Sequence, residues 1–216
     1  MNKIENLIFD LDGTLIDSSE GVISAVNYSL RQMGEREQPP EIIKRYIGYP
    51  LSQMYPDFSD KPVAELYKHF QVKAKETIVA STVQLEGVQS TLEQLRDDNY
   101  RLAIATTKIK SHVDGIIDKF DWHDLILCAS GGDEVKKVKP APDIFELTLK
   151  KMNGQIENSI VIGDTENDIL AAHAIGLKSV GVISPYGDCE KLLKAKPDYT
   201  ISSIVELLPL IKKLNS

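Results

Sequence analysis

The sequence is poor in cysteine, in basic charge and in long apolar runs. Its two cysteines, Cys128 and Cys189, lie in unrelated contexts, which argues against a disulfide scaffold and favours reduced thiols in the cytoplasm. The 25 lysines and arginines are outnumbered by 32 acidic residues, so a nucleic-acid surface is not expected. No apolar run approaches the roughly 18 residues that a membrane helix needs, and no signal peptide precedes the apolar run that starts at Ile4.

Short apolar runs alternate with helix-like stretches along most of the chain. The runs lie near residues 4–9, 101–106, 125–129, 159–163, 178–183 and 198–201. The helix-like stretches between them include 87–98, 110–119, 141–152 and 166–176. This alternation predicts an α/β fold with a doubly wound parallel sheet, in which ligands bind at the carboxyl ends of the strands.

One interval, from Asp17 to Val83, contains no convincing strand. Its helix-like stretches cover about 19–34, 41–48 and 62–79, and prolines separate them. Such an insert predicts a small helical bundle that depends on packing against the main domain. We therefore expect a core formed by residues 1–17 and 84–216, with residues 18–83 inserted as a helical cap.

Two carboxylates follow the first apolar run. Leu7, Ile8 and Phe9 lead into Asp10 and Asp12, and a Gly-Thr turn comes next. Side chains two apart on an extended strand point to the same side, so the two acids face one region. Like charges this close are costly unless a cation lies between them, and a hard divalent cation would meet that need.

A second run also ends in acids. Residues 159–163 lead into Asp164, and Asp168 follows at the start of a helical pattern. Asp164 has no capping duty of its own, whereas Asp168 has two readings. It could support a site, or it could simply cap the helix, since an acid in a first turn interacts favourably with the helix dipole.

Hydroxyl groups and a lysine complete the polar set. The run at 101–105 ends in Thr106, Thr107 and Lys108, and Lys139 precedes a proline further along the chain. A hydroxyl donor and an ammonium charge are what a phosphoryl group needs. The neighbouring residues 136–137 are expected to form a solvated surface instead.

These segments resemble the four motifs of the haloacid dehalogenase superfamily, in the order that the superfamily keeps. Asp-Leu-Asp-Gly-Thr resembles the first motif, Thr106 the second, Lys139 the third, and Gly-Asp-x-x-x-Asp the fourth. The similarity is greatest to the branch of phosphoglycolate phosphatases and related bacterial pyrophosphatases. Membership in that branch implies a Rossmann-like core and a helical cap of the C1 type over the crevice.

The resemblance also implies roles for particular residues. Asp10 would be the nucleophile that forms an aspartyl phosphate, and Asp12 the general acid and base. Mg²⁺ would be the cofactor, bound by Asp10, Asp164 and the backbone carbonyl of Asp12. The phosphoryl group would contact a further set, in which Thr106 and Lys139 are also catalytic: Gly13, Thr14, Thr106, Thr107, Lys108 and Lys139. Asp168 and Asn167 would support the site.

Departures from the family patterns separate this chain from relatives. Dehalogenases and phosphonatases lack an acid at the place of Asp12. Sugar phosphomutases resemble the chain closely but usually carry Val or Phe where Thr14 stands, and His where Val22 stands. A β-phosphoglucomutase-like mutase therefore remains the alternative within the superfamily. The four histidines, at positions 69, 112, 123 and 173, are expected to be surface or packing residues.

Two alternatives come from other classes of protein. A receiver-type phosphoacceptor gathers similar groups around Mg²⁺, but the long insert and the Asp-x-Asp-Gly-Thr turn fit it poorly. A binding protein on an inactive enzyme fold is disfavoured by the complete set of carboxylates. We predict a phosphatase of a small substrate, either a phosphoglycolate-like monoester or pyrophosphate, that is a monomer or weak dimer. Lys44 and Arg45 could bind a second anionic group or could form an exposed helix end.

Overall fold

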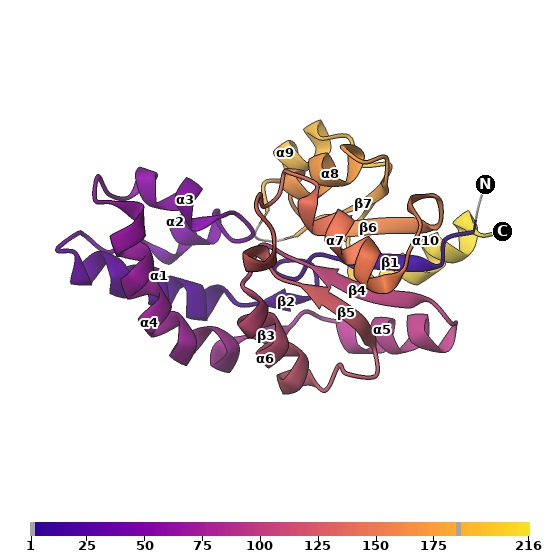
Figure 1. Ribbon diagram of the computed structural model, residues 1–216, viewed down its shortest axis with the longest axis horizontal. Coiled ribbons are helices and arrows are strands. Elements are labelled where there is room, and N and C mark those ends of the chain that lie inside the picture. Colours follow the sequence, from indigo (N-terminus) through magenta and orange to yellow (C-terminus); the bar gives the residue numbers. More distant parts are fainter. Residues whose placement is uncertain (1–2, 185–186) are drawn as a thin grey trace.

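The computed structural model describes residues 3–184 and 187–216. A six-stranded sheet, in which every pairing is parallel, has the strand order β5-β4-β1-β6-β7-β8 (Figure 1). Its strands are β1 (Asn6–Phe9), β4 (Arg101–Ala105), β5 (Ile126–Ser130), β6 (Ser159–Gly163), β7 (Lys178–Val182) and β8 (Tyr199–Ile201). The predicted α/β fold with a parallel sheet is confirmed.

Helices cover both faces of this sheet. On one face, α5 (Val88–Asp97), α6 (Lys110–Phe120) and α10 (Leu207–Leu214) share an apolar cluster with Leu7 and Phe9 of β1. On the other, α7 (Asp143–Met152) and α8 (Glu166–His173) pack against Ile8. Successive β1 side chains thus enter opposite cores, because strand side chains alternate between the faces. The short α9 (Cys189–Lys194) contacts α8.

The insert forms a separate group of helices beside the core (Figure 1). Its members are α1 (Ser19–Gln32), α2 (Pro40–Lys44), α3 (Leu51–Met54) and α4 (Val63–Ser81). The long helices α1 and α4 pack along each other, and their apolar faces bury a cluster of their own that includes Ala25, Leu30, Leu66, Phe70 and Ile78. This packing accounts for a helical insert in a stretch that lacks strand periodicity.

Two short strands join the insert to the core. β2 (Ile16–Asp17) and β3 (Val83–Gln84) pair antiparallel, so the two connections lie side by side. The prediction that no strand occurs between Asp17 and Val83 is therefore wrong at its two ends. Strands of two residues have no periodicity to detect, because their pairing is set by the tertiary contact.

Three further helices were not named among the helix-like stretches of the sequence: α3, α9 and α10. The first two are shorter than two turns, so their sequence carries little helical pattern. Asp188 caps α9 by accepting hydrogen bonds from the backbone amides of Glu190 and Lys191, at 3.0 and 3.1 Å. Within residues 3–184 and 187–216, no helix has the length and apolar character to cross a membrane.

Candidate active site

Three neighbouring strands bring polar residues to one edge of the sheet. Asp10 follows β1, Thr106 follows β4 and Asp164 follows β6. Because β1 lies between β4 and β6, with Phe9 in register with both neighbours, these three residues emerge side by side. All three are buried. The topology thus collects one residue from each of three motifs at the carboxyl end of the sheet.

Lys139 joins this group from the segment before α7. Its side chain is only 2% exposed. The ammonium donates hydrogen bonds to Asp10 Oδ1 at 2.7 Å, to Asp168 Oδ1 at 2.6 Å and to the Ala105 carbonyl at 2.6 Å. Burial alone would lower the pKa of Lys139, but the two carboxylates outweigh it and raise that pKa, so the side chain is a fixed positive charge.

Asp168 performs two tasks. One of its oxygens accepts the hydrogen bond from Lys139, and the other accepts from the Thr165 amide at 3.1 Å and the Thr165 hydroxyl at 2.7 Å. The second set caps the start of α8. The two readings of Asp168 from the sequence are therefore compatible, because one carboxylate both caps the helix and positions Lys139.

The carboxylates of Asp10, Asp164 and Asp168 form a cluster, in which one oxygen from each residue lies within 4.8 Å of the other two. Burial, together with the neighbouring Asp168 and Asp12 charges, raises the pKa of Asp10 to about 7 even though Lys139 opposes the shift. Burial and the charges of Asp10 and Asp168 likewise raise the pKa of Asp164 well above its usual range. The cluster therefore carries more negative charge than one lysine balances.

The donor set fits a hard divalent cation. Asp10 Oδ2 is buried and has no hydrogen-bond partner among the described residues, whereas both Asp168 oxygens already accept hydrogen bonds. Asp10 and Asp164 are consequently the carboxylates best placed to ligate a metal. Oxygen-only ligands in a buried acidic pocket suit Mg²⁺. Within the described residues, Asp10, Asp164 and Asp168 are the one group of acidic, histidine or cysteine side chains whose ligand atoms lie close enough to share an ion.

Gly13 and Thr14, expected to contact phosphate, lie against Asp164. Gly13 has a φ of +80°, and a Cβ at this position would overlap the Asp164 carboxylate. Glycine is required there both for the left-handed backbone and for the close approach. The Thr14 hydroxyl lies 3.5 Å from Asp164 Oδ1. Both residues thus contribute to the position of a carboxylate.

Asp12 is held by partners of its own. One Asp12 oxygen accepts a hydrogen bond from the Ser18 hydroxyl, and the other forms an ion pair with the Lys108 ammonium at 3.2 Å. The Lys108 ammonium also lies 3.4 Å from the Ser18 oxygen. The sequence-based expectation gave no role to Ser18, although it lies only four residues after the first motif.

The second motif connects the site to the cap. The Thr106 hydroxyl accepts a hydrogen bond from the Lys108 amide at 3.2 Å. The Thr107 hydroxyl points to the insert and donates to the Gly48 carbonyl at 3.2 Å. Beside it, the Tyr49 hydroxyl donates to Glu166 at 2.7 Å. Thr107, expected to bind substrate, therefore makes a contact between cap and core in this structure.

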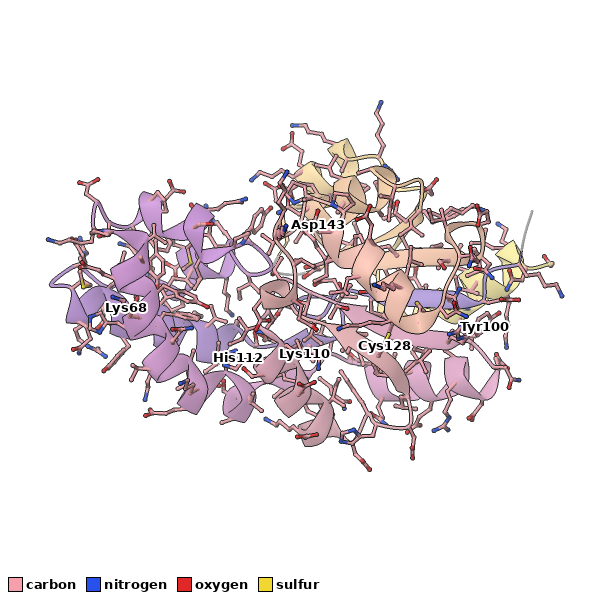
Figure 2. All side chains as sticks on the ribbon, in the orientation of Figure 1. Lys68, Tyr100, Lys110, His112, Cys128 and Asp143 are labelled. Atoms are coloured by element: carbon pink, nitrogen blue, oxygen red, sulfur yellow. The ribbon has the colours of Figure 1, made fainter. Side chains whose placement is uncertain are left out.

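A cavity of about 740 Å³ opens between the cap and the core. Asp12, Thr107 and Lys108 form part of its core wall. His112 of α6 also lines it, at the junction of the two parts (Figure 2). Burial and the nearby Lys108 charge lower the pKa of His112 to about 4, so its ring is neutral at pH 7. No sequence pattern placed this histidine near the site, since all four histidines were expected to be surface or packing residues.

The remaining residues considered from the sequence are Asn167 in the core and the pair Lys44 and Arg45 in the insert. Asn167, expected to support the site, is buried in the first turn of α8, and its Nδ2 has no hydrogen-bond partner among the described residues. Lys44 and Arg45 are absent from the residues that line the cavity. Arg45 is exposed and Lys44 partly so, as an exposed helix end would be.

The fold and this site define a hydrolase of one family. Residues 7–182 match the model of the haloacid dehalogenase-like hydrolases, and the chain belongs to that family. It is 30% identical over 214 residues to pyrophosphatase PpaX of Bacillus pumilus, with 97% of each chain covered. The family and the branch that the motifs indicated are thereby confirmed.

Solved structures share the whole architecture. A predicted phosphatase from Clostridium acetobutylicum superposes with a TM-score of 0.89 at 26% identity, covering 98% of this chain and 100% of that one. A predicted phosphoglycolate phosphatase from Haemophilus somnus gives a TM-score of 0.84 at 24% identity, with coverage of 97% and 99%. The latter likeness concerns the fold alone.

Proposed function

We propose that this chain is a Mg²⁺-dependent phosphatase that hydrolyses a small phosphorylated metabolite through an aspartyl phosphate on Asp10. The observation that supports the proposal most strongly is the hydrogen bond from the Lys139 ammonium to Asp10 Oδ1, at 2.7 Å, beside the buried Asp164 and Thr106. Membership in the hydrolase family and the similarity to pyrophosphatase PpaX support it. The sequence motifs favour a phosphoglycolate-like monoester or pyrophosphate as substrate.

The residues at the strand ends suit the cofactor. Asp10, Asp164 and the backbone carbonyl of Asp12 would hold Mg²⁺. When bound, the cation would neutralise charge on the substrate phosphate and favour the ionised form of the carboxylates. The raised pKa of Asp10, about 7, means that the nucleophile needs this positive charge, in addition to Lys139, to be fully ionised at neutral pH.

Asp10 acts as the nucleophile. Its carboxylate oxygen bonds to phosphorus while the bond from phosphorus to the leaving oxygen breaks. Lys139 fixes the orientation of the Asp10 carboxylate through the contact at Oδ1, and Asp168 fixes Lys139 in turn. The buried lysine also offsets the charge that accumulates on the transferring group. Asn167 lies one residue from Asp168 and would stiffen this end of the site.

Asp12 moves the proton. It gives a proton to the leaving oxygen in the first half of the reaction, then takes one from the water that attacks phosphorus, which frees phosphate and restores Asp10. Ser18 and Lys108 hold its carboxylate at the edge of the cavity, where a leaving group would lie. The Thr106 hydroxyl accepts from a backbone amide, so its own proton remains available to the phosphoryl group.

The insert of residues 18–83 would serve as the cap. Thr107 and Tyr49 bond across the boundary between cap and core, so closure would exclude water and opening would release product. A cytoplasmic location and a monomeric or weakly dimeric state are parts of the same proposal. Both cysteines are free of disulfides, which is consistent with that location.

Turnover of p-nitrophenyl phosphate with and without Mg²⁺ tests this proposal. We expect many turnovers per enzyme with Mg²⁺, little activity in excess chelator, and loss of activity in Asp10→Asn, because an amide is not a nucleophile here. Asp97→Asn, an exposed change on α5, is the control and should retain wild-type activity. Normal turnover by Asp10→Asn would refute the mechanism. A long-lived phosphoprotein without turnover would instead support the receiver-type alternative.

A second assay separates the phosphatase from a mutase. Wild-type protein is given β-glucose 1-phosphate with a bisphosphate primer, and both phosphate and glucose 6-phosphate are measured. We expect phosphate release to dominate, since Val22 presents an apolar wall to the cavity at the place where the mutases carry histidine. Fast isomerisation with little free phosphate would overturn the assignment.

A further inference from the structure

The cavity beside Asp12 has a partly polar wall on the core side and a mainly apolar wall on the cap side. Its core wall includes the polar groups of Asp12, Lys108 and His112, and its cap wall is formed largely by apolar side chains. The latter come from α1, α3, α4 and the loop before α3, and they include Val22, Leu51, Met54, Val63, Phe70 and Ile78. Because the cavity meets the site at the proposed proton donor, its contents would be the leaving group, with the phosphoryl group deeper at Asp10.

Aromatic rings extend this apolar wall. Tyr67 and Phe70 of α4 lie with ring centroids 6.4 Å apart and ring planes within 14° of parallel. Tyr46 packs edge-on against Phe58 at 5.3 Å, and its hydroxyl is bonded to Asp57. The polar tips of such tyrosines have partners or face water, whereas their rings present hydrocarbon surface. Aromatic walls of this kind favour planar apolar ligands.

Positive charge is scarce where an anionic leaving group would need it. Among the described lining residues, two are lysines: Lys108, which is paired with Asp12, and Lys75, which is exposed on α4. His112 is neutral at pH 7 because burial lowers its pKa. Lys44 and Arg45 do not line the cavity. A carboxylate or second phosphate would lose hydration there with little compensation.

We propose that the preferred substrates are phosphomonoesters of apolar alcohols about the size of a substituted aromatic ring, whose leaving group fills the cavity under the cap. This inference rests on the proposed phosphatase function and refines its substrate class away from glycolate and pyrophosphate. The volume of about 740 Å³ lies within the usual range of small-molecule pockets and leaves ample room for a leaving group of this size. Burial of a phenyl group from water would drive the selection.

The direct test compares two primary alkyl phosphates whose leaving groups have similar acidity, and measures phosphoglycolate and pyrophosphate beside them as competing substrates. Initial rates with Mg²⁺ give kcat/KM for n-propyl phosphate, 3-phenylpropyl phosphate, phosphoglycolate and pyrophosphate. Since the propyl and phenylpropyl alcohols differ in apolar size and hardly in reactivity, their ratio reports binding in the cavity. We expect at least about a tenfold preference for 3-phenylpropyl phosphate, mainly in KM, which corresponds to about 1.4 kcal/mol.

Variants of the cap locate the effect. Tyr67→Ala should lower the ratio of kcat/KM for 3-phenylpropyl phosphate to that for n-propyl phosphate severalfold. Leu51→Arg, at a partly exposed lining position, should shift the preference toward phosphoglycolate. Val72→Ala is the matched control, because Val72 lies on the same helix as Tyr67 but is 54% exposed and does not line the cavity. It should keep the wild-type ratio.

Binding provides a readout that does not need turnover. Titration calorimetry with 3-phenylpropylphosphonate and n-propylphosphonate, which are not hydrolysed, should give tighter binding of the phenyl compound by about tenfold. Equal binding constants for the two phosphonates, or a higher kcat/KM for phosphoglycolate or pyrophosphate than for 3-phenylpropyl phosphate, would overturn the inference and leave the phosphatase intact. Absence of Asp10-dependent turnover on every substrate would instead refute the phosphatase, while the phosphonate ratio would still decide the character of the cavity.

Discussion

Replacement of Lys139 by methionine removes the only ammonium that bonds to the Asp10 and Asp168 carboxylates in the described structure, at nearly constant side-chain length. Three acceptors lose their donor: one oxygen on each acid, and the Ala105 carbonyl. Loss of one partner from a buried ion pair costs about 3–5 kcal/mol, because the remaining charge is buried without compensation. For a chain of this length, each kcal/mol lowers Tm by about 2–4 °C. We therefore expect Lys139→Met to lower Tm by about 6–20 °C.

Urea and thermal unfolding, followed by circular dichroism in the absence of Mg²⁺, provide the measurement. Lys194→Met is the matched control, since the Lys194 ammonium pairs with Glu190 at 2.7 Å with both side chains more than 70% exposed. Exposed pairs contribute at most about 1 kcal/mol. Adding Asp168→Asn to Lys139→Met should recover part of the loss, because it removes one uncompensated charge. A Lys139→Met protein no less stable than the Lys194→Met control would refute the reasoning about the buried cluster.

Three other changes have defined outcomes. Gly13→Ala should cost more than the about 1–2 kcal/mol of a left-handed alanine and should weaken Mg²⁺ binding in calorimetry, because the new Cβ displaces Asp164. His112→Gln should make the protein less sensitive to acid in urea titrations between pH 6.5 and 4. Tyr49→Phe, which removes a hydrogen bond worth about 0.5–1.5 kcal/mol between cap and core, should raise KM about twofold to tenfold with a smaller change in kcat.

The sign of the His112 effect follows from its lowered pKa. As pH falls from 6.5 to 4, the unfolded chain binds a proton at this ring that the folded protein, with a pKa of about 4, does not. Folding stability therefore falls over that window, by up to about 3 kcal/mol at about 1.36 kcal/mol per pH unit. An unchanged acid profile in His112→Gln would contradict the burial of a neutral ring.

The matched control for Gly13→Ala is Gly34→Ala. Gly34→Ala has the same type of backbone cost, at a φ of +74°, but nothing lies near the new Cβ. Equal losses of stability and metal binding in Gly34→Ala and Gly13→Ala would show that contact with the carboxylate is irrelevant. For Tyr49→Phe, an unchanged KM on every substrate would mean that this contact does not hold the cap closed.

The parallel sheet, and the motifs that follow its strands, could be predicted because the sequence signals for both are local. Strongly apolar runs such as 159–163 mark buried strands, and the acids or hydroxyls that end them mark the ligand edge of the sheet. The helical character of the insert followed from the same periodicity. The joint strands at Asp17 and Val83 could not be predicted, since two-residue strands depend on a partner far along the chain.

The contacts within the site were harder to predict from the sequence than the residues that form it. The Ser18 hydroxyl and the Lys108 ammonium lie 3.4 Å apart because two segments that are distant in the sequence converge there, and no local pattern encodes that convergence. The contact of Thr107 with a cap carbonyl likewise depends on how the insert packs. The apolar wall of the cavity comes from scattered positions on several cap elements, which look like ordinary core residues in the sequence.

Chemical trapping of the intermediate tests the central claim most directly. During turnover with Mg²⁺ and substrate, the reaction is quenched and treated with borohydride, which reduces an acyl phosphate to an alcohol, and the peptides are analysed by mass spectrometry. We predict that Asp10 is converted to homoserine only when both substrate and Mg²⁺ are present, and that Asp12, Asp164 and Asp168 are untouched. Reduction at another acid, or none at Asp10 while phosphate is being released, would contradict the proposed mechanism.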